Sequence, residues 1–431
     1  MATYTRRGLF GLGFAASSVA LAGCAGMGGG SQQSGDANNL QFWSNHPGSS
    51  KSVEQELIKG FEQASQGVKI TLVDGGKDYE EVAQKFNAAL SGGDLPDIVV
   101  VSDVTWFNFA LNKQLAPIDD LAQKAGLDLS DYVKPLYADY QLEGKHYALP
   151  YSRSTPLFYY NKTMWKAAGL PDKGPESWDQ LREWSDALRS KAGAKLACAM
   201  ANGANYLDWT FQGLAWSMDG AYSKDFTATF TDPNTVKAAT FVQEFKKSGL
   251  FDVSPDPAPV FSSGQAACIV ESTGSLQAIL KGSAGKFEVG TAFLPGPKGR
   301  SCPTGGAGLA IPAGISEERK INALKAIGFL TNTDSTATFA EATGYMPVRT
   351  SALQTQKIKD YLAKVPQAKT ALDQLEYTKP QDAARVFVAG GGKQIGGALD
   401  KIVQGQSVPT VLGDLQAWMK PKLDDLAKKV K

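Results

Sequence analysis

The sequence predicts an α/β protein with two lobes, hinge crossings between the lobes, and a C-terminal helical region. Short apolar runs alternate with amphipathic stretches from residue 40 onward, which is typical of strands and helices around a mostly parallel sheet. The roughly 390 residues after residue 39 exceed one hydrophobic core, which favours two lobes. The pattern breaks at polar residues 151–156 and at glycine-rich residues 305–308, where we expect the chain to cross between lobes.

The first lobe is predicted to comprise residues 40–151 and 308–347. Its clearest strand is residues 97–101, a nearly continuous apolar run of the kind found in strands buried on both faces. Ser102 and Asp103 follow at the carboxyl edge, where open α/β sheets usually bind ligands. The elements expected in this lobe are strands over 40–43, 68–73, 97–101 and 309–312, and helices over 53–64, 79–90, 316–331 and 334–342.

The second lobe is predicted to comprise residues 152–307 and 348–431. Residues 203–220 carry four large aromatic side chains, which suit either a core or the lining of a cleft. The turn 271–275 follows an apolar strand and can open a helix whose first amides stay free. The other elements expected here are strands over 157–160 and 266–270, helices beginning at 163 and spanning 178–190 and 236–248, and a helical tail.

Residues 1–23 are predicted to be an export signal. Arg6 and Arg7 precede an apolar stretch that ends in Leu21-Ala22-Gly23-Cys24, the layout of a signal whose cysteine is lipidated. The arginine pair favours twin-arginine export, while the general secretory route stays open. Residues 24–39 are rich in Gly, Ser and Gln and are predicted to be a flexible tether. We therefore expect an extracytoplasmic protein anchored to the cell membrane by a lipid on Cys24.

Composition is that of a soluble globular chain. With 43% hydrophobic residues, 20% charged residues and a net charge of +1, the sequence lacks the basic stripe that nucleic acid requires. No other run approaches the roughly 20 apolar residues of a membrane span. Lipidation of Cys24 leaves Cys198, Cys268 and Cys302, so one disulfide at most forms within the chain and its pairing stays open.

Catalytic and metal-binding motifs are absent from the sequence. It contains no H-E-x-x-H, G-x-S-x-G, Walker glycine loop or C-x-x-C, and the cysteine spacing fits no metal site, so we expect no cofactor and no metal. The histidines available to a hydrolase are His46 and His146. His146 follows a hairpin-turn pattern at Glu143-Gly144-Lys145, which predicts a solvent-facing side chain. Enzyme function is therefore unsupported.

Several motifs resemble a known family. Residues 40–431 resemble the extracellular solute-binding proteins of ABC importers, and the segment from Ser154 to Lys162, with Ser177-Trp178, resembles the carbohydrate-type members. The stretches 343–347, 272–275 and 305–307 resemble the narrower group that binds glycerol-3-phosphate and glycerophosphodiesters such as glycerophosphocholine. The resemblance implies a periplasmic-binding-protein-like clamshell and a monomer that delivers a small polar solute to ABC permease subunits.

The resemblance also implies ligand-binding residues. Tyr79 and Asp103 match the positions that hydrogen-bond glycerol hydroxyl groups in the family. Tyr206 and Trp209 match an aromatic pair that stacks on glycerol or holds a quaternary ammonium group by cation–π attraction. The positions that match the family's polar contacts to the phosphate are Ser154, Ser272, Gly306 and Tyr345.

One position departs from the family pattern. The arginine that pairs the phosphate in the family aligns with Gly396, and Arg385 or Lys393 is left as a substitute. A lysine lacks the bidentate fork of arginine. A dianionic phosphate monoester is therefore a less suitable ligand than a phosphodiester or an uncharged saccharide.

Six of the eight candidate residues also have a purely structural interpretation. Large rings are often buried, and small polar residues often cap helices. On this view Tyr79 packs at a helix start, Asp103 is an N-cap, Tyr206 and Trp209 are core aromatics, Ser272 is a cap, and Gly306 relieves backbone strain.

Other functions also stay open at this stage. An oligosaccharide-binding protein of an ABC importer is the main alternative, favoured by the aromatic content and the missing arginine. A secreted hydrolase would have to use His46 or His146. A structural surface lipoprotein would have no ligand cleft.

Overall fold

The computed structural model describes residues 36–297 and 302–430. The predicted signal peptide, the lipidation site Cys24 and residues 25–35 of the predicted tether lie outside the described residues. Residues 36–39 of that tether are held in place, because the Arg319 guanidinium donates to the carbonyl oxygen of Asp36 over 3.0 Å. Asn39 already belongs to the first strand.

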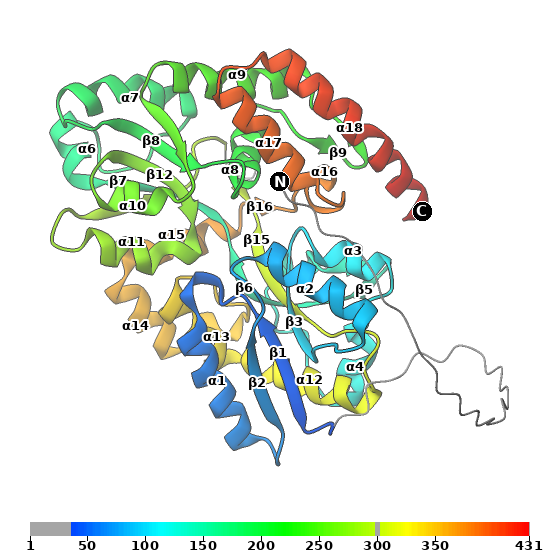
Figure 1. Ribbon diagram of the computed structural model, residues 1–431. Coiled ribbons are helices and arrows are strands. Elements are labelled where there is room, and N and C mark those ends of the chain that lie inside the picture. Colours follow the sequence, from blue (N-terminus) through cyan, green and yellow to red (C-terminus); the bar gives the residue numbers. More distant parts are fainter. Residues whose placement is uncertain (1–35, 298–301, 431) are drawn as a thin grey trace, which may run out of the picture. The chain divides into compact units, whose positions relative to one another are not determined.

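The first five-stranded sheet has the strand order β2-β1-β3-β15-β6 (Figure 1). Strands β1, β2 and β3 run parallel, and Phe42 of β1 faces Ile98 of β3 in the register. Strand β15 is antiparallel to both of its neighbours, so the chain returns to this sheet late in the sequence. The bounds are β1 Asn39–Ser44, β2 Lys69–Asp74, β3 Ile98–Ser102, β6 Leu149–Ser154 and β15 Gly305–Ala310.

Amphipathic helices pack on the first sheet. Asp78 caps α2, since its carboxylate accepts from the amide of Glu81 over 2.9 Å. A buried ion pair joins Arg319 of α12 to Asp97, which immediately precedes β3. The helices are α1 Lys51–Ala64, α2 Tyr79–Gly92, α3 Trp106–Leu111, α4 Ile118–Ala125, α5 Lys134–Ala138, α12 Glu317–Leu330 and α13 Thr333–Thr343.

The second five-stranded sheet has the order β11-β8-β12-β7-β13. Its central strand β12 is almost completely buried and runs parallel to β8 and antiparallel to β7. The strands are β7 Pro156–Asn161, β8 Leu196–Ala201, β11 Phe251–Ser254, β12 Ala266–Ser272 and β13 Val289–Ala292. The accompanying helices are α6 Lys162–Ala168, α7 Trp178–Ser190, α8 Leu207–Ser217, α9 Pro233–Lys247, α10 Pro257–Ser262 and α11 Leu276–Ser283.

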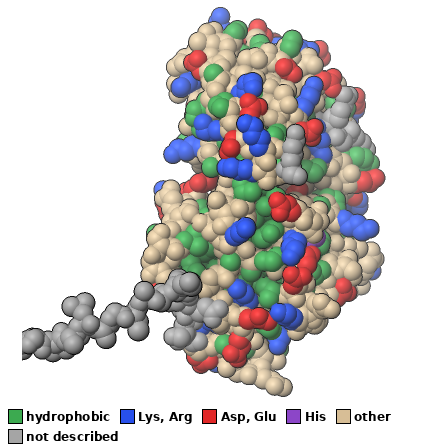
Figure 2. Space-filling model, turned by 90° about the vertical axis from the view of Figure 1, so that its right-hand side faces the viewer, with side chains coloured by type: hydrophobic (Ala, Val, Ile, Leu, Met, Phe, Trp, Pro, Cys, Tyr) green, Lys and Arg blue, Asp and Glu red, His purple; other side chains and the backbone are tan. Residues whose placement is uncertain are grey.

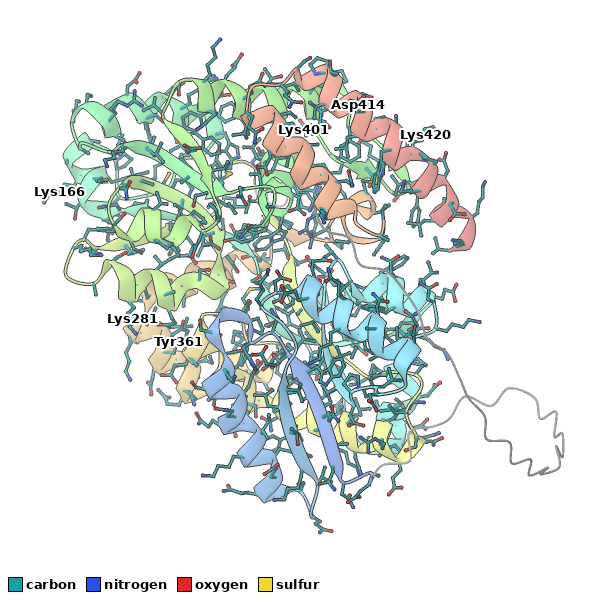
Figure 3. All side chains as sticks on the ribbon, in the orientation of Figure 1. Lys166, Lys281, Tyr361, Lys401, Asp414 and Lys420 are labelled. Atoms are coloured by element: carbon teal, nitrogen blue, oxygen red, sulfur yellow. The ribbon has the colours of Figure 1, made fainter. Side chains whose placement is uncertain are left out.

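The C-terminal region is helical, as the sequence predicts. Side chains such as Lys401, Asp414 and Lys420 point away from the body of the protein along α17 and α18 (Figure 3). A short strand, β16 Thr378–Lys379, pairs with β14 Cys302–Pro303. The helices are α14 Gln356–Lys364, α15 Pro366–Leu375, α16 Ala383–Val386, α17 Gly391–Val403 and α18 Val408–Lys429.

The two segments predicted as crossings contain strands. The polar residues 151–156 end β6 and begin β7, because their polar groups find partners inside the protein. Arg153 is buried and donates to the hydroxyl oxygen of Tyr140 over 2.9 Å and to Asp139. Asp139 also accepts from the Thr304 hydroxyl over 2.7 Å. The glycines expected to precede a strand at residue 309 are themselves part of β15.

His146 is not solvent-facing, which corrects the prediction from the turn pattern. The hairpin of β4 Gln141–Leu142 and β5 Lys145–His146 is present. The imidazole nevertheless stacks on Tyr137 with 3.7 Å between ring centroids and hydrogen-bonds Asp119 over 2.9 Å, which leaves 13% of the side chain exposed. Turn chemistry identified the hairpin but carried no information about these packing partners.

The surface charges are mixed, as the net charge of +1 suggests, and the described cysteines form no disulfide. Acidic and basic side chains are interspersed on the face shown in Figure 2. Cys198, Cys268 and Cys302 are free and buried. Among the described residues, no helix is both long and apolar enough to cross a membrane.

Candidate functional site

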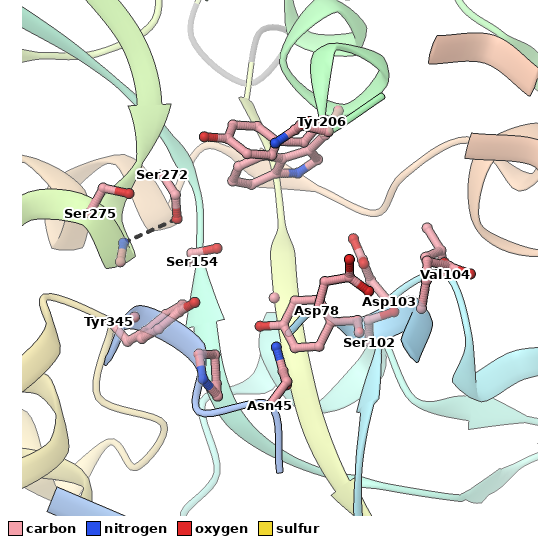
Figure 4. A pocket seen from close by; sticks show the side chains of 18 of the residues that line it. Asn45, Asp78, Ser102, Asp103, Val104, Ser154, Tyr206, Ser272, Ser275 and Tyr345 are labelled. Atoms are coloured by element: carbon pink, nitrogen blue, oxygen red, sulfur yellow. Dashed lines mark hydrogen bonds between the residues drawn. The ribbon is translucent and has the colours of Figure 1, made fainter. Parts of the chain in front are cut away.

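A cavity of about 930 Å³ contains all eight predicted ligand-binding residues in its lining. Figure 4 shows Ser272, Ser275 and Tyr345 on one side, Asp103 and Ser102 on the other, and Tyr206 above them. The residues come from loops and element ends around both sheets. The predicted residues in the lining are Tyr79, Asp103, Ser154, Tyr206, Trp209, Ser272, Gly306 and Tyr345.

Tyr79 and Asp103 reach the cavity from the carboxyl edge of the first sheet. Tyr79 is the first residue of α2, and its hydroxyl lies 3.5 Å from the hydroxyl of Ser152. Asp103 follows β3, and its amide donates to the carbonyl oxygen of Gly306 over 3.0 Å. The N-cap of α3 is Thr105, so Asp103 is not a helix cap and its carboxylate faces other partners.

Ser154 and Gly306 lie where β6 and β15 meet. Gly306 has φ +99°, and a β-carbon on it would lie 2.0 Å from the carbonyl oxygen of Ser152. Only glycine fits this position, because both the backbone conformation and the close approach exclude a side chain. The strands therefore meet tightly here, and Ser154 is buried in the cavity wall.

Tyr345 is held between two glycines. A β-carbon on Gly274 would lie 2.6 Å from Cζ of the tyrosine ring, and one on Gly48 would lie 2.8 Å from Cε2. The ring also stacks on Phe339 with centroids 5.9 Å apart. Tyr345 is 9% exposed and its position is fixed by these contacts.

Tyr206 and Trp209 form an aromatic pair with ring centroids 6.4 Å apart and an interplanar angle of 72°. The Trp209 indole N–H donates to the carbonyl oxygen of Thr304 over 2.9 Å, and the ring is 6% exposed. Trp209 is therefore partly a core residue and partly a lining residue, so the two interpretations of this ring are compatible. Tyr206 is half-buried and lies at the start of α8.

Ser272 both caps the short helix at Thr273–Ser275 and lines the cavity. Its hydroxyl oxygen accepts from the amide of Gly274 over 3.1 Å at the end of β12, as a capping serine does. The neighbouring Glu271 also lines the cavity, although it is only 1% exposed. Burial raises the pKa of the Glu271 carboxyl to about 7, against the opposing effect of hydrogen bonds from Tyr206 and Ser272.

Arg385 lines the cavity, whereas Lys393 does not. Of these two substitutes for the family's phosphate-pairing arginine, Arg385 is therefore the one at the site. It donates to Asp208 over 2.7 Å and to Asp103 over 3.1 Å, and its guanidinium also contacts Gln381. Gly396 packs against the backbone of Gly203, away from the lining, and Lys393 is exposed. The charge of Arg385 is therefore already balanced by two carboxylates.

The geometry does not support a hydrolase. His46 lines the cavity and bonds through Nδ1 to Glu54, but its Nε2 has no hydrogen-bond partner. The Ser44 hydroxyl donates to Glu54 over 2.8 Å and not to the imidazole. His146 lies outside the lining. In the part of the chain that the structure describes, no cluster of His, Cys, Asp or Glu is suited to a metal ion.

Sequence reasoning missed several polar lining residues. Asp78 and Glu80 flank Tyr79, and Glu271 precedes Ser272. Adjacency to a predicted contact was the available signal, since a loop that delivers one side chain to a cavity usually brings its neighbours. Asn45 and His46 follow β1 at the same sheet edge, and both line the cavity.

Comparison with known proteins agrees with this arrangement. The model of the bacterial extracellular solute-binding protein family matches residues 56–367. The sn-glycerol-3-phosphate-binding periplasmic protein UgpB of Salmonella typhimurium is 29% identical over 383 residues, covering 84% of this chain and 86% of that protein. UgpB of Escherichia coli K12 is 27% identical over 377 residues, covering 83% and 84%.

Solved structures share the fold. The crystal structure of UgpB from Mycobacterium tuberculosis in complex with glycerophosphocholine has a TM-score of 0.87 and 47% identity, covering 90% of this chain and 99% of that one. The GacH receptor of Streptomyces glaucescens, solved unliganded and with acarbose, has a TM-score of 0.74 and 22% identity, covering 91% and 98%. At that identity the likeness is one of fold. The predicted periplasmic-binding-protein-like fold is thus confirmed, and the chain belongs to the family of bacterial extracellular solute-binding proteins.

Proposed function

We propose that this protein is the solute-binding component of an ABC importer and captures a glycerophosphodiester of the glycerophosphocholine type. The observation that carries the proposal is the cavity that all eight residues named from the family pattern line together. It is supported by the 47% identity to a protein whose structure holds glycerophosphocholine. A cavity of this size, with aromatic walls and a few placed polar groups, suits a small organic solute.

The charges of the lining favour a diester over a monoester. Four carboxylates, Asp78, Glu80, Asp103 and Glu271, face two cations, Lys77 and Arg385. Arg385 is already paired with Asp103 and Asp208, so a second phosphate charge would be buried without a free counter-charge. A zwitterionic diester brings one negative and one positive charge and is therefore better matched than glycerol-3-phosphate.

We assign the roles of the site residues on the same basis. Tyr79 and Asp103 bind glycerol hydroxyl groups, and Ser154, Ser272, Gly306 and Tyr345 contact the phosphate. Tyr206 and Trp209 face the head group. Residues 40–151 with 308–347 act as one lobe and residues 152–307 with 348–431 as the other, and both lobes close on the ligand as hinge proteins do.

Isothermal titration calorimetry tests the ligand class. We expect micromolar or tighter binding of glycerophosphocholine and at least about tenfold weaker binding of glycerol-3-phosphate, the size of one lost charge-assisted contact. Binding of maltotriose without glycerophosphocholine would replace the proposal by an oligosaccharide-binding protein, the second candidate, which the aromatic pair Tyr206 and Trp209 favours.

Anchoring is a separate part of the proposal. A diacylglyceryl group on Cys24 would hold the monomeric protein at the membrane beside its permease. Cys24→Ser is expected to move the protein from the membrane fraction to the soluble fraction. Mass spectrometry of the mature N-terminus checks the lipid directly, and an unmodified Cys24 in membranes would refute it.

A further inference from the structure

Glu271 is surrounded by hydrogen-bond donors. Its Oε2 accepts from the Tyr206 hydroxyl over 2.6 Å, and its Oε1 accepts from the Ser272 amide over 2.6 Å and from the Ser275 hydroxyl over 3.2 Å. Three donors on two oxygens are the arrangement that a carboxylate anion requires. These donors hold the ionised side chain in place, although its burial favours the protonated form.

Among the described residues, Glu271 forms no ion pair, and its hydrogen-bond donors are uncharged. Among the largest influences on the pKa of Glu271, the charged side chain is Asp256, in the loop before α10, and it is another carboxylate. The charge of Glu271 in turn contributes to the raised pKa of Tyr159 of β7, Tyr206 and Tyr345. The cations of the cavity are engaged elsewhere, Lys77 with Glu81 over 2.8 Å and Arg385 with Asp103 and Asp208. A buried negative charge without a counter-charge is costly unless a ligand supplies the positive charge.

We propose that Glu271 sets the preference of the cavity for solutes with a positively charged head. Glu271 is a positioning residue, because it acts on the head group through the ring of Tyr206. This inference rests on the proposed function, since it concerns the head group of the same ligand. A phenol that donates to a carboxylate gains electron density in its ring, which strengthens the attraction of the ring face for a cation. Low local polarity strengthens the effect further, because charges in a buried site are poorly screened.

The inference has a pH signature. The pKa of Glu271, raised to about 7, places protonation of this group in the physiological range. Protonation removes both the negative charge and the polarisation of the Tyr206 ring. Preference for a cationic head is therefore expected to weaken as the pH falls below about 7, while contacts to glycerol and phosphate stay unchanged.

A matched pair of ligands isolates the head-group charge. One is glycerophosphocholine, and the other is its carbon isostere, the 3,3-dimethylbutyl diester of glycerol phosphate, which has the same shape without the positive charge. Neither ligand titrates between pH 5.5 and pH 8.5, so any pH dependence of their affinity ratio belongs to the protein. Calorimetry at both pH values on the full mature chain gives this ratio.

The wild-type ratio is expected to rise about fivefold between pH 5.5 and pH 8.5, the strength of one cation–π contact. In Glu271→Gln the ratio is expected to stay at its low-pH value, and Tyr206→Phe, which keeps the ring, is expected to lower it at high pH. Glu317→Gln in α12 is the control, since this carboxylate pairs with Lys124 outside the cavity lining, and it is expected to keep the rise.

A pH-independent wild-type ratio, or a rise that survives in Glu271→Gln, overturns the role of Glu271 and leaves the proposed function standing. If Glu271→Gln fails to fold, Tyr206→Phe decides, and an unchanged ratio in that variant overturns the inference. If neither ligand binds at either pH, the proposed function falls and this inference falls with it.

Discussion

Gly274 and Tyr345 are in direct contact, with no room for a β-carbon between them. A methyl group on Gly274 would lie 2.6 Å from Cζ of the tyrosine, and the ring has Gly48 on another side and Phe339 stacked on it. The ring therefore cannot move away from the glycine without disturbing its other neighbours. The missing side chain of Gly274 therefore positions Tyr345, which is predicted to contact the phosphate.

Gly274→Ala is expected to weaken glycerophosphocholine binding by about tenfold or more, because the Tyr345 ring must shift, and interiors tolerate extra methyl groups poorly. Calorimetry measures the loss. Gly413→Ala in α18 is the control, since nothing lies within 4 Å of the added methyl group and alanine favours a helix. Gly413→Ala is expected to bind normally, and an equal loss in both variants would contradict the explanation.

Arg385→Ala is expected to destabilise the protein by about 3–5 kcal/mol, because it leaves Asp208 buried without its counter-charge. Burial already raises the pKa of Asp208, and Arg385 is the main opposing influence. Denaturant unfolding measures the change.

Arg385→Lys separates charge from geometry at the same position. Lysine keeps the positive charge but cannot contact Asp103 and Asp208 as a fork, so a partial loss is expected. Full stability in Arg385→Ala would show that the network contributes little to the fold.

Stability without ligand is expected to depend on Glu271. Its pKa in the folded protein is about 7, above the ordinary 4.5, so the folded state holds the proton more tightly. The stabilisation is therefore fully present below about pH 4.5 and is lost as the pH rises through about 7, by up to about 3 kcal/mol. Asp382, whose pKa burial raises to about 6, acts in the same direction. The difference between wild type and Glu271→Gln, followed by urea unfolding at pH 5 and pH 8, isolates the contribution of Glu271.

The three described thiols are expected to be unreactive in the native state. Cys198, Cys268 and Cys302 are free and buried, and burial raises the pKa of Cys302 and Cys268. A soluble form without Cys24 should therefore release no thionitrobenzoate with Ellman's reagent until denaturant is added, when three equivalents appear. Fewer than three equivalents in denaturant would reveal a disulfide that the fold described above lacks.

Much of the architecture follows from local pattern. The helix predicted over residues 178–190 is α7 with the same bounds, because an amphipathic period and a capping serine both act within a few residues. The strand predicted at 97–101 differs from β3 by one residue at each end. The eight predicted site residues line one cavity because the family pattern preserves the element ends that carry them.

Tertiary structure alone decided the partners of the charged groups. Asp103 and Arg385 are 282 residues apart in the chain, and Tyr206 and Glu271 are 65 apart, so no local pattern connects them. The glycines at 305–308 likewise precede the strand predicted from residue 309, and they become part of β15 because β3 and β6 flank them. The sequence by itself determined the element types, the family pattern and the residues at the sheet edges, since these depend on neighbours along the chain. The fold decided which charges meet and which stay unpaired, because Coulombic and packing energies depend on distance in space.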